Sequence, residues 1–89
     1  MPRKIEFSAS FLRQSGKLVN KNPQLYDKLE KTIRDLTDDP FKPSLKTHPL
    51  KGKLEGKHAC SLTHSLRIVF EITDDCVALI DMGSHDEVY

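Results

Sequence analysis

The spacing of apolar residues in the first half of the chain predicts one short strand followed by two helices. Residues 3–7 form the strand candidate, and Ser8 is a suitable N-cap for the helix after it. The apolar positions of this first helix come in two pairs seven residues apart: Phe11, Leu12, Leu18 and Val19. A second apolar stripe follows Pro23: Leu25, Leu29, Ile33 and Leu36. We expect this helix to end near Pro40, because proline disfavours helix in the residue before it.

The second half of the chain changes to the two-residue period of strands. Its clearest segment alternates so that one face is apolar: Leu66, Ile68, Phe70 and Ile72. Asp74 and Asp75 predict a tight turn into another strand, and residues 57–63 form a weaker strand candidate. Residues 39–53 contain three prolines and predict a loop. The order β-α-α-β-β-β predicts the α+β class, with an antiparallel sheet and a helical hairpin on one face.

Length and composition favour a single small cytoplasmic domain over residues 1–89. The chain has 89 residues and two cysteines, too few for a disulfide framework. No apolar run approaches the ~18 residues of a membrane span, and the N-terminal residues do not resemble a secretory signal. We therefore expect a cytoplasmic protein with no membrane partner.

The charge is unevenly distributed although the net charge is only +1. Residues 42–70 carry six Lys and Arg and one acid, whereas residues 71–89 carry six acids and no Lys or Arg. The basic middle segment could contact a polyanion such as RNA. The acidic end does not suit that role and could instead contact a basic partner.

Residues 47–58, THPLKGKLEGKH, concentrate lysine, glycine and histidine and allow several interpretations. A P-loop needs four residues between its glycines, but Gly52 and Gly56 are separated by three. No histidine or cysteine pair has a familiar zinc spacing, so we expect no metal and no cofactor. Two interpretations remain open: a solvated loop entering a strand, or one wall of an RNA groove.

The groove interpretation depends on residues far away in the chain. Arg67 alternates with the apolar row of its strand, so it faces away from the predicted helices. His85 follows the last predicted strand, and Tyr89 is an aromatic residue in a chain with few of them. Taken singly, Arg67 is equally well explained as a surface cation or a partner for Glu71, and a histidine near the end of a chain is usually a surface residue. The terminal aromatic residue is the least expected of the three.

Taken together, three segments resemble the RelE/ParE superfamily of type II toxin–antitoxin toxins. They are HPLKGKLEGKH from residue 48, LRIVFEITDD from residue 66 and GSHDEVY from residue 83. The resemblance covers residues 48–89 and is greatest to the YoeB and YafQ branches, which are ribosome-dependent endoribonucleases that cut mRNA. It implies a RelE-like fold for the whole chain.

The resemblance also implies roles for individual residues. His48 stands where relatives place an acid–base residue, Arg67 where an arginine contacts the scissile phosphate, and His85 at the position of a catalytic histidine. Tyr89 matches a terminal aromatic residue that contacts the substrate. Charge and proximity alone add five further substrate-binding candidates: Lys51, Lys53, Lys57, His58 and His64.

The implied reaction is metal-independent attack of an RNA 2′-OH on its adjacent phosphate. Histidines suit both proton transfers, and the arginine fork suits the growing phosphoryl charge. The assignment of base to His48 and acid to His85 stays open, since His58 or His64 could replace His48. Ser61 and Ser65 stand where the YafQ branch has a histidine and an aspartate, so those two roles are vacant.

The resemblance further implies a cognate antitoxin, bound in a hetero-oligomer, together with mRNA and the ribosome as partners. Two other functions compete with the nuclease: a non-catalytic ParE-like inhibitor of DNA gyrase, and a non-toxic RNA-binding domain with the same fold.

Overall fold

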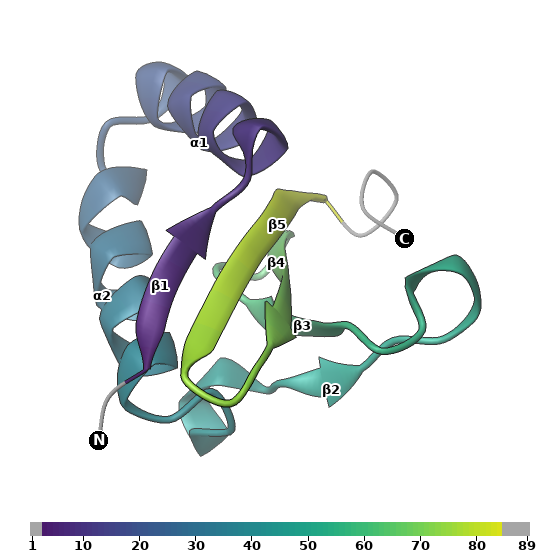
Figure 1. Cartoon of the computed structure of the whole chain (residues 1–89). Coiled ribbons are helices and arrows are strands. Elements are labelled where there is room, and N and C mark those ends of the chain that lie inside the picture. Colours follow the sequence, from purple (N-terminus) through teal and green to yellow (C-terminus); the bar gives the residue numbers. More distant parts are fainter. Residues whose placement is uncertain (1–2, 85–89) are drawn as a thin grey trace.

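The computed structural model describes residues 3–84, which form two helices beside a five-stranded sheet (Figure 1). The helices are α1 (Ala9–Lys21) and α2 (Leu25–Asp38). The strands are β1 (Lys4–Phe7), β2 (His48–Pro49), β3 (His58–Ser61), β4 (Leu66–Ile72) and β5 (Cys76–Ser84). Two short 3₁₀ helices, η1 (Pro43–Leu45) and η2 (Gly52–Leu54), lie in the segment that was expected to be loop. The α+β class and the order of the predicted elements are confirmed.

The prediction of an all-antiparallel sheet is wrong. The strand order is β1-β5-β4-β3-β2, and β1 runs parallel to β5 while the other neighbours are antiparallel. A parallel neighbour requires a long crossover connection, and the two helices and the three later strands supply it. The two-residue strand β2 was also missed, because its proline-containing sequence has no strand pattern.

The helix starts and ends are set by local sequence. Ser8 caps α1, since its Oγ accepts a hydrogen bond from the backbone N–H of Phe11 at 3.0 Å. The same hydroxyl donates to the carbonyl of Ile80, so the cap also ties α1 to β5. Helix α2 begins at Leu25, two residues after Pro23. Within residues 3–84 no helix is long and apolar enough to cross a membrane.

Both helices cover the same face of the sheet and enclose the main core. The core side chains come from α1, α2 and the helix-facing positions of the strands, and they include Phe11, Leu36, Ile68, Phe70 and Leu79. The alternation predicted for β4 is confirmed, since its apolar row packs into this core. Among residues 3–84, no α-helix covers the opposite face of the sheet (Figure 1).

A second, smaller apolar cluster lies on that opposite face. Ala59 of β3 and Val69 of β4 are buried there against Leu50, and Leu54 and Ile80 pack around them. Leu50 and Leu54 therefore anchor the segment between β2 and β3 to the sheet. Two lysines of the same segment, Lys51 and Lys53, are exposed to solvent.

Lys46 has an unfavourable backbone conformation, and its replacement by glycine is expected to stabilise the fold. Lys46 is the one non-glycine residue with positive φ (54°) within residues 3–84. The left-handed conformation costs a non-glycine residue about 1 kcal/mol. Glycine avoids this cost, but its unfolded state has more conformational freedom, and this offsets part of the gain in stability. We expect Lys46→Gly to raise the free energy of unfolding by up to about 1 kcal/mol. Urea denaturation checks this, and a destabilised variant would contradict it.

Candidate functional site

His48 lies exposed on the short edge strand β2. Its Nδ1 is 3.2 Å from the carbonyl oxygen of Lys46. Because a carbonyl only accepts hydrogen bonds, this contact requires a proton on Nδ1. In the neutral ring Nε2 is then the nitrogen that carries the lone pair, as a general base needs.

Arg67 lies near the start of β4 and is partly buried. Its guanidinium does not point straight out from the sheet but turns toward the connection between β3 and β4. There Nη1 donates to the carbonyl oxygens of Thr63 and His64 at 3.0 and 3.2 Å. A third contact, to the carbonyl of Leu66, measures 3.1 Å. These contacts hold the guanidinium in position through one of its terminal nitrogens, Nη1.

The strand register places His48 and Arg67 on the same, helix-free face of the sheet. His48 pairs with Ala59, and Ala59 pairs with Val69, which is two residues from Arg67 in β4. Cross-strand partners, and residues two apart in a strand, project to the same face. Two strands and two residues of separation correspond to about 12 Å between the two Cα atoms. The two residues therefore lie on one face of the sheet, with the guanidinium of Arg67 turned toward the β3–β4 connection.

The end of β5 lies beside Arg67 in the same sheet. Gly83 pairs with Arg67, and Ser84, the last described residue, pairs with Leu66. His85 and Tyr89, which the sequence analysis placed in the site, lie outside the described residues. Their contribution stays a prediction.

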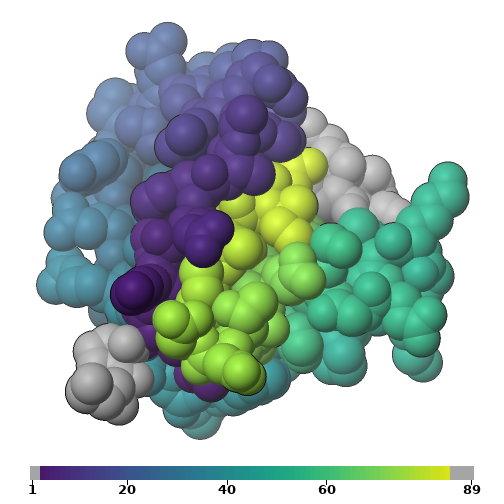
Figure 2. All heavy atoms as spheres, in the orientation of Figure 1, coloured from purple at the N-terminus to yellow at the C-terminus, as the bar shows by residue number. Residues whose placement is uncertain are grey.

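The lysine-rich segment between β2 and β3 projects from the sheet, on the side away from the helices (Figure 1). Figure 2 shows the same teal segment standing out from the body of the molecule. Lys51 and Lys53 are exposed and Lys57 is half-buried. The positive φ values of Gly52 (69°) and Gly56 (89°) show that these glycines shape the path of the segment. Nothing in its geometry resembles a phosphate-binding P-loop.

His58 is placed differently from the other candidates. It pairs with Phe70, so it projects to the helix-covered face, opposite to Arg67. Its ring stacks on Phe70 with a centroid distance of 6.0 Å and meets the edge of Phe41 at 5.5 Å. Its Nδ1 is buried and has no hydrogen-bond partner among residues 3–84. These contacts are typical of a histidine packed at the edge of the core. They favour His48 over His58 as the candidate general base.

His64 is exposed in the connection between β3 and β4 and lines a polar pocket of about 360 Å³. Arg67, Ser61 and two lysines line the same pocket, Lys28 from α2 and Lys46 after η1. Sequence reasoning missed both of these lysines. No sequence signal marks Lys28, because a lysine on the polar side of a helix is the usual arrangement.

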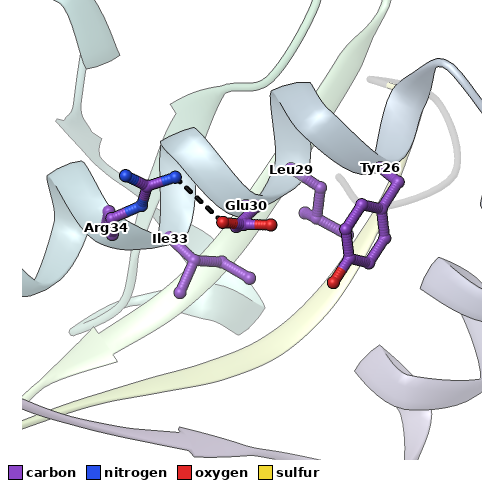
Figure 3. A pocket seen from close by; sticks show the side chains of 5 residues that line it. All are labelled: Tyr26, Leu29, Glu30, Ile33 and Arg34. Carbon is purple, nitrogen blue, oxygen red and sulfur yellow. Dashed lines mark hydrogen bonds and ion pairs between the residues drawn. The ribbon is translucent and has the colours of Figure 1, made fainter.

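A second hollow, of about 390 Å³, lies on α2 (Figure 3). Tyr26, Leu29 and Ile33 form its apolar lining, and Glu30 and Arg34 pair across it at 2.9 Å. It is formed by α2 and contains none of the candidate catalytic side chains. Its apolar character fits a protein segment better than a nucleic acid.

The cysteines do not contribute a reactive group to the site. Cys60 is buried in the main core, and burial raises the pKa of its thiol to about 12. Cys76 donates to a carboxylate oxygen of Glu6 at 3.1 Å, and this contact raises its pKa as well. Both thiols therefore stay protonated near neutral pH. Within the described part of the chain, no three His, Cys, Asp or Glu side chains gather into a group suited to a metal ion.

The mixed sheet with two helices on one face is the architecture of the RelE/ParE superfamily of toxins. A family model described as "Bacterial toxin of type II toxin-antitoxin system, YafQ" matches residues 3–89. The chain therefore belongs to the YafQ family of type II toxin–antitoxin toxins, and the resemblance noted in the sequence is confirmed.

Individual relatives agree with this family. Toxin YoeB of Streptomyces coelicolor is 33% identical over 58 residues, covering 65% of this chain and 69% of the relative. The crystal structure of YafQ from E. coli strain BL21(DE3) has a TM-score of 0.81 at 22% identity, covering 98% of each chain. YafQ in the E. coli DinJ–YafQ toxin–antitoxin complex has a TM-score of 0.79 at 22% identity, covering 100% of this chain and 99% of that one. At these identities the two structures show a shared fold.

Proposed function

We propose that this toxin is an endoribonuclease that cuts mRNA on the ribosome without a metal ion. The observation that carries the proposal is the shared, helix-free face of the sheet, on which the register brings His48 and Arg67 together. A base and a fixed cation about 12 Å apart at their Cα atoms leave room for one phosphodiester between their side chains. Membership of the YafQ family supports the same activity.

His48 acts as the general base of this reaction. Its exposed ring, with Nδ1 toward the Lys46 carbonyl, would take the 2′-OH proton on Nε2. The 2′-oxygen then attacks the adjacent phosphorus, and the bond to the 5′-oxygen breaks. His85 donates a proton to that leaving oxygen, so the products are a 2′,3′-cyclic phosphate and a free 5′-OH.

Arg67 stabilises the negative charge that grows on the phosphoryl oxygens during this attack. Its contacts with the β3–β4 connection use Nη1, and they hold the guanidinium in place before the substrate arrives. The nucleophile belongs to the RNA, so the mechanism needs no cofactor. Tyr89 would stack on a base and hold the nucleotide in line for the attack.

The projecting lysines are expected to bind RNA electrostatically rather than to take part in the chemistry. Replacing Lys51, Lys53 and Lys57 together by glutamine removes exposed charges from one segment. We expect weaker ribosome binding and a salt dependence flatter by about one unit of slope per lost phosphate contact. Binding titrations at several salt concentrations measure this. An unchanged slope would remove these lysines from the interface.

The partner that restrains the toxin in the cell is an antitoxin. The DinJ–YafQ complex shows that a protein of this fold pairs with an antitoxin. The hollow on α2 is largely apolar, so an amphipathic segment of the antitoxin could bury its own apolar face there (Figure 3). This hollow is separate from the catalytic face, so antitoxin binding there would leave the catalytic side chains in place.

Expression of the toxin and mapping of RNA ends test the proposed function directly. We expect growth arrest together with new 5′-OH ends inside translated mRNAs, and the same cuts by purified toxin on programmed ribosomes. Growth arrest with gyrase-linked DNA breaks and intact mRNA would replace the nuclease by a ParE-like inhibitor. Absence of both arrest and cleavage would leave a non-toxic RNA-binding domain.

A further inference from the structure

The polar pocket beside the β3–β4 connection collects positive charge from three separate parts of the chain. Lys28 comes from α2, Lys46 follows η1, and Arg67 comes from β4. The hydroxyl-bearing residues Ser44 and Ser61 line the pocket as well, and none of its lining residues within 3–84 is an Asp or Glu. Its volume of about 360 Å³ is in the range of small-ligand sites, which are about 300–1,000 Å³. A pocket with this set of cationic and hydroxyl-bearing side chains is suited to a phosphate group.

The two lysines of this pocket are not neutralised within residues 3–84. Neither Lys28 nor Lys46 takes part in an ion pair there. Lys31 and Lys42 show the contrast, because both pair with Asp35, at 3.0 and 3.3 Å. The ammonium groups beside the pocket are thus available to a ligand, whereas those of Lys31 and Lys42 are already engaged.

The backbone at Lys46 gives independent support. Its φ of 54° is a conformation in which glycine would be more stable, yet a lysine occupies the position. A residue kept in an unfavourable conformation often has a functional side chain. Here that side chain lines the pocket.

We propose that this pocket is a second phosphate subsite, in which Lys28 and Lys46 bind a backbone phosphate of RNA other than the one that is cut. The inference rests on the proposed nuclease function and extends it, since Arg67 borders both the pocket and the catalytic face. The bound strand would then run from the helix-free face around the end of the sheet toward α2. The phosphate can come from the mRNA or from ribosomal RNA, which share this chemistry.

Binding without cleavage tests the subsite separately from the catalytic proposal. One arm titrates a fully 2′-O-methylated RNA 12-mer, which cannot be cut, and the other measures co-sedimentation with empty 70S ribosomes. The test protein carries Lys28→Gln and Lys46→Gly. The second change removes the charge and is expected to favour the backbone, so weaker binding cannot be attributed to unfolding. The control carries Lys17→Gln and Lys21→Gln, an equal loss of charge from exposed positions of α1.

We expect the double variant to bind at least fivefold more weakly in one of the two arms, with a salt slope lower by about 0.7 per lost single-strand phosphate contact. The arm that responds identifies the source of the phosphate. The control should stay within twofold of the unmodified toxin. Unchanged binding in both arms, or an equal loss in the control, overturns the subsite.

The same data separate the subsite from the nuclease. A toxin that binds through the pocket but cuts no RNA would end the nuclease proposal and keep the subsite. A toxin that cuts RNA while the double variant binds normally would end the subsite alone.

Discussion

Replacing Arg67 by glutamine is expected to slow RNA cleavage about 100- to 1,000-fold, which corresponds to about 3–4 kcal/mol of transition-state stabilisation. Glutamine removes the charge and the fork that would meet the phosphoryl oxygens. Arg67→Lys keeps the charge but not the paired donors, so we expect an intermediate loss. Single-turnover cleavage of programmed ribosomes measures both variants, because it isolates the chemical step from product release.

Arg67 also contacts the β3–β4 connection, so the loss of activity must be separated from a loss of structure. Arg13→Gln is a matched control, since it makes the same change at an exposed position of α1. Thermal unfolding of both variants shows whether the fold is kept. Cleavage by folded Arg67→Gln within tenfold of the unmodified rate, about 1.4 kcal/mol, would contradict the role given to this arginine.

His48→Ala and His85→Ala belong in the same assay. Because the base and the acid act in one reaction, their combined loss should be smaller than the product of the two single losses. His58→Ala distinguishes the alternative base: its packing between Phe41 and Phe70 predicts a change in stability rather than in rate.

Replacing Phe70 by alanine is expected to remove a large part of the stability of the toxin. Phe70 lies in the middle of β4 with 0% of its surface exposed. Loss of a buried phenylalanine costs about 3–5 kcal/mol, because the transfer of the ring is lost and a cavity remains. A domain of this size has on the order of 5–10 kcal/mol of total stability. Thermal unfolding should show a midpoint lower by roughly 15–30 °C.

Tyr26→Ala is the control for the size of the removed ring. Tyr26 is 56% exposed on α2, so little apolar surface returns to water when it is shortened. We expect a change below about 1 kcal/mol. Equal losses for Phe70→Ala and Tyr26→Ala would mean that the sheet core is not the main source of stability.

The fold was predictable where a single local pattern determines an element. The apolar stripes of α1 and α2 and the alternation in β4 each repeat with the period of their element. The Ser8 cap was recognisable for the same reason, since the residue bonds only three positions away. The parallel pairing of β1 with β5 was not predictable in this way, because it joins residues about 70 positions apart.

The candidate site was predictable only in part. The residue types came from the sequence and from the resemblance of residues 48–89 to a toxin superfamily. The opposite orientations of His58 and Arg67 follow from the pleat of β3 and β4 once their register is known. The pocket lysines were not recognisable, because Lys28 is one of several polar residues on its helix until η1 and the β3–β4 connection pack beside it.

The sequence by itself determined the two α-helices and the longer strands, the membership of a toxin family and the kinds of side chain available for RNA cleavage. These depend on periodicity and on short motifs, which are local properties of a chain. Only the tertiary structure decided that β1 joins the last strand in parallel, that His48 and Arg67 share one face of the sheet, and that Lys28 and Lys46 line one pocket with Arg67. Such placements depend on register and packing between distant segments, whose energies arise only when the core of Phe11, Leu36 and Phe70 has formed.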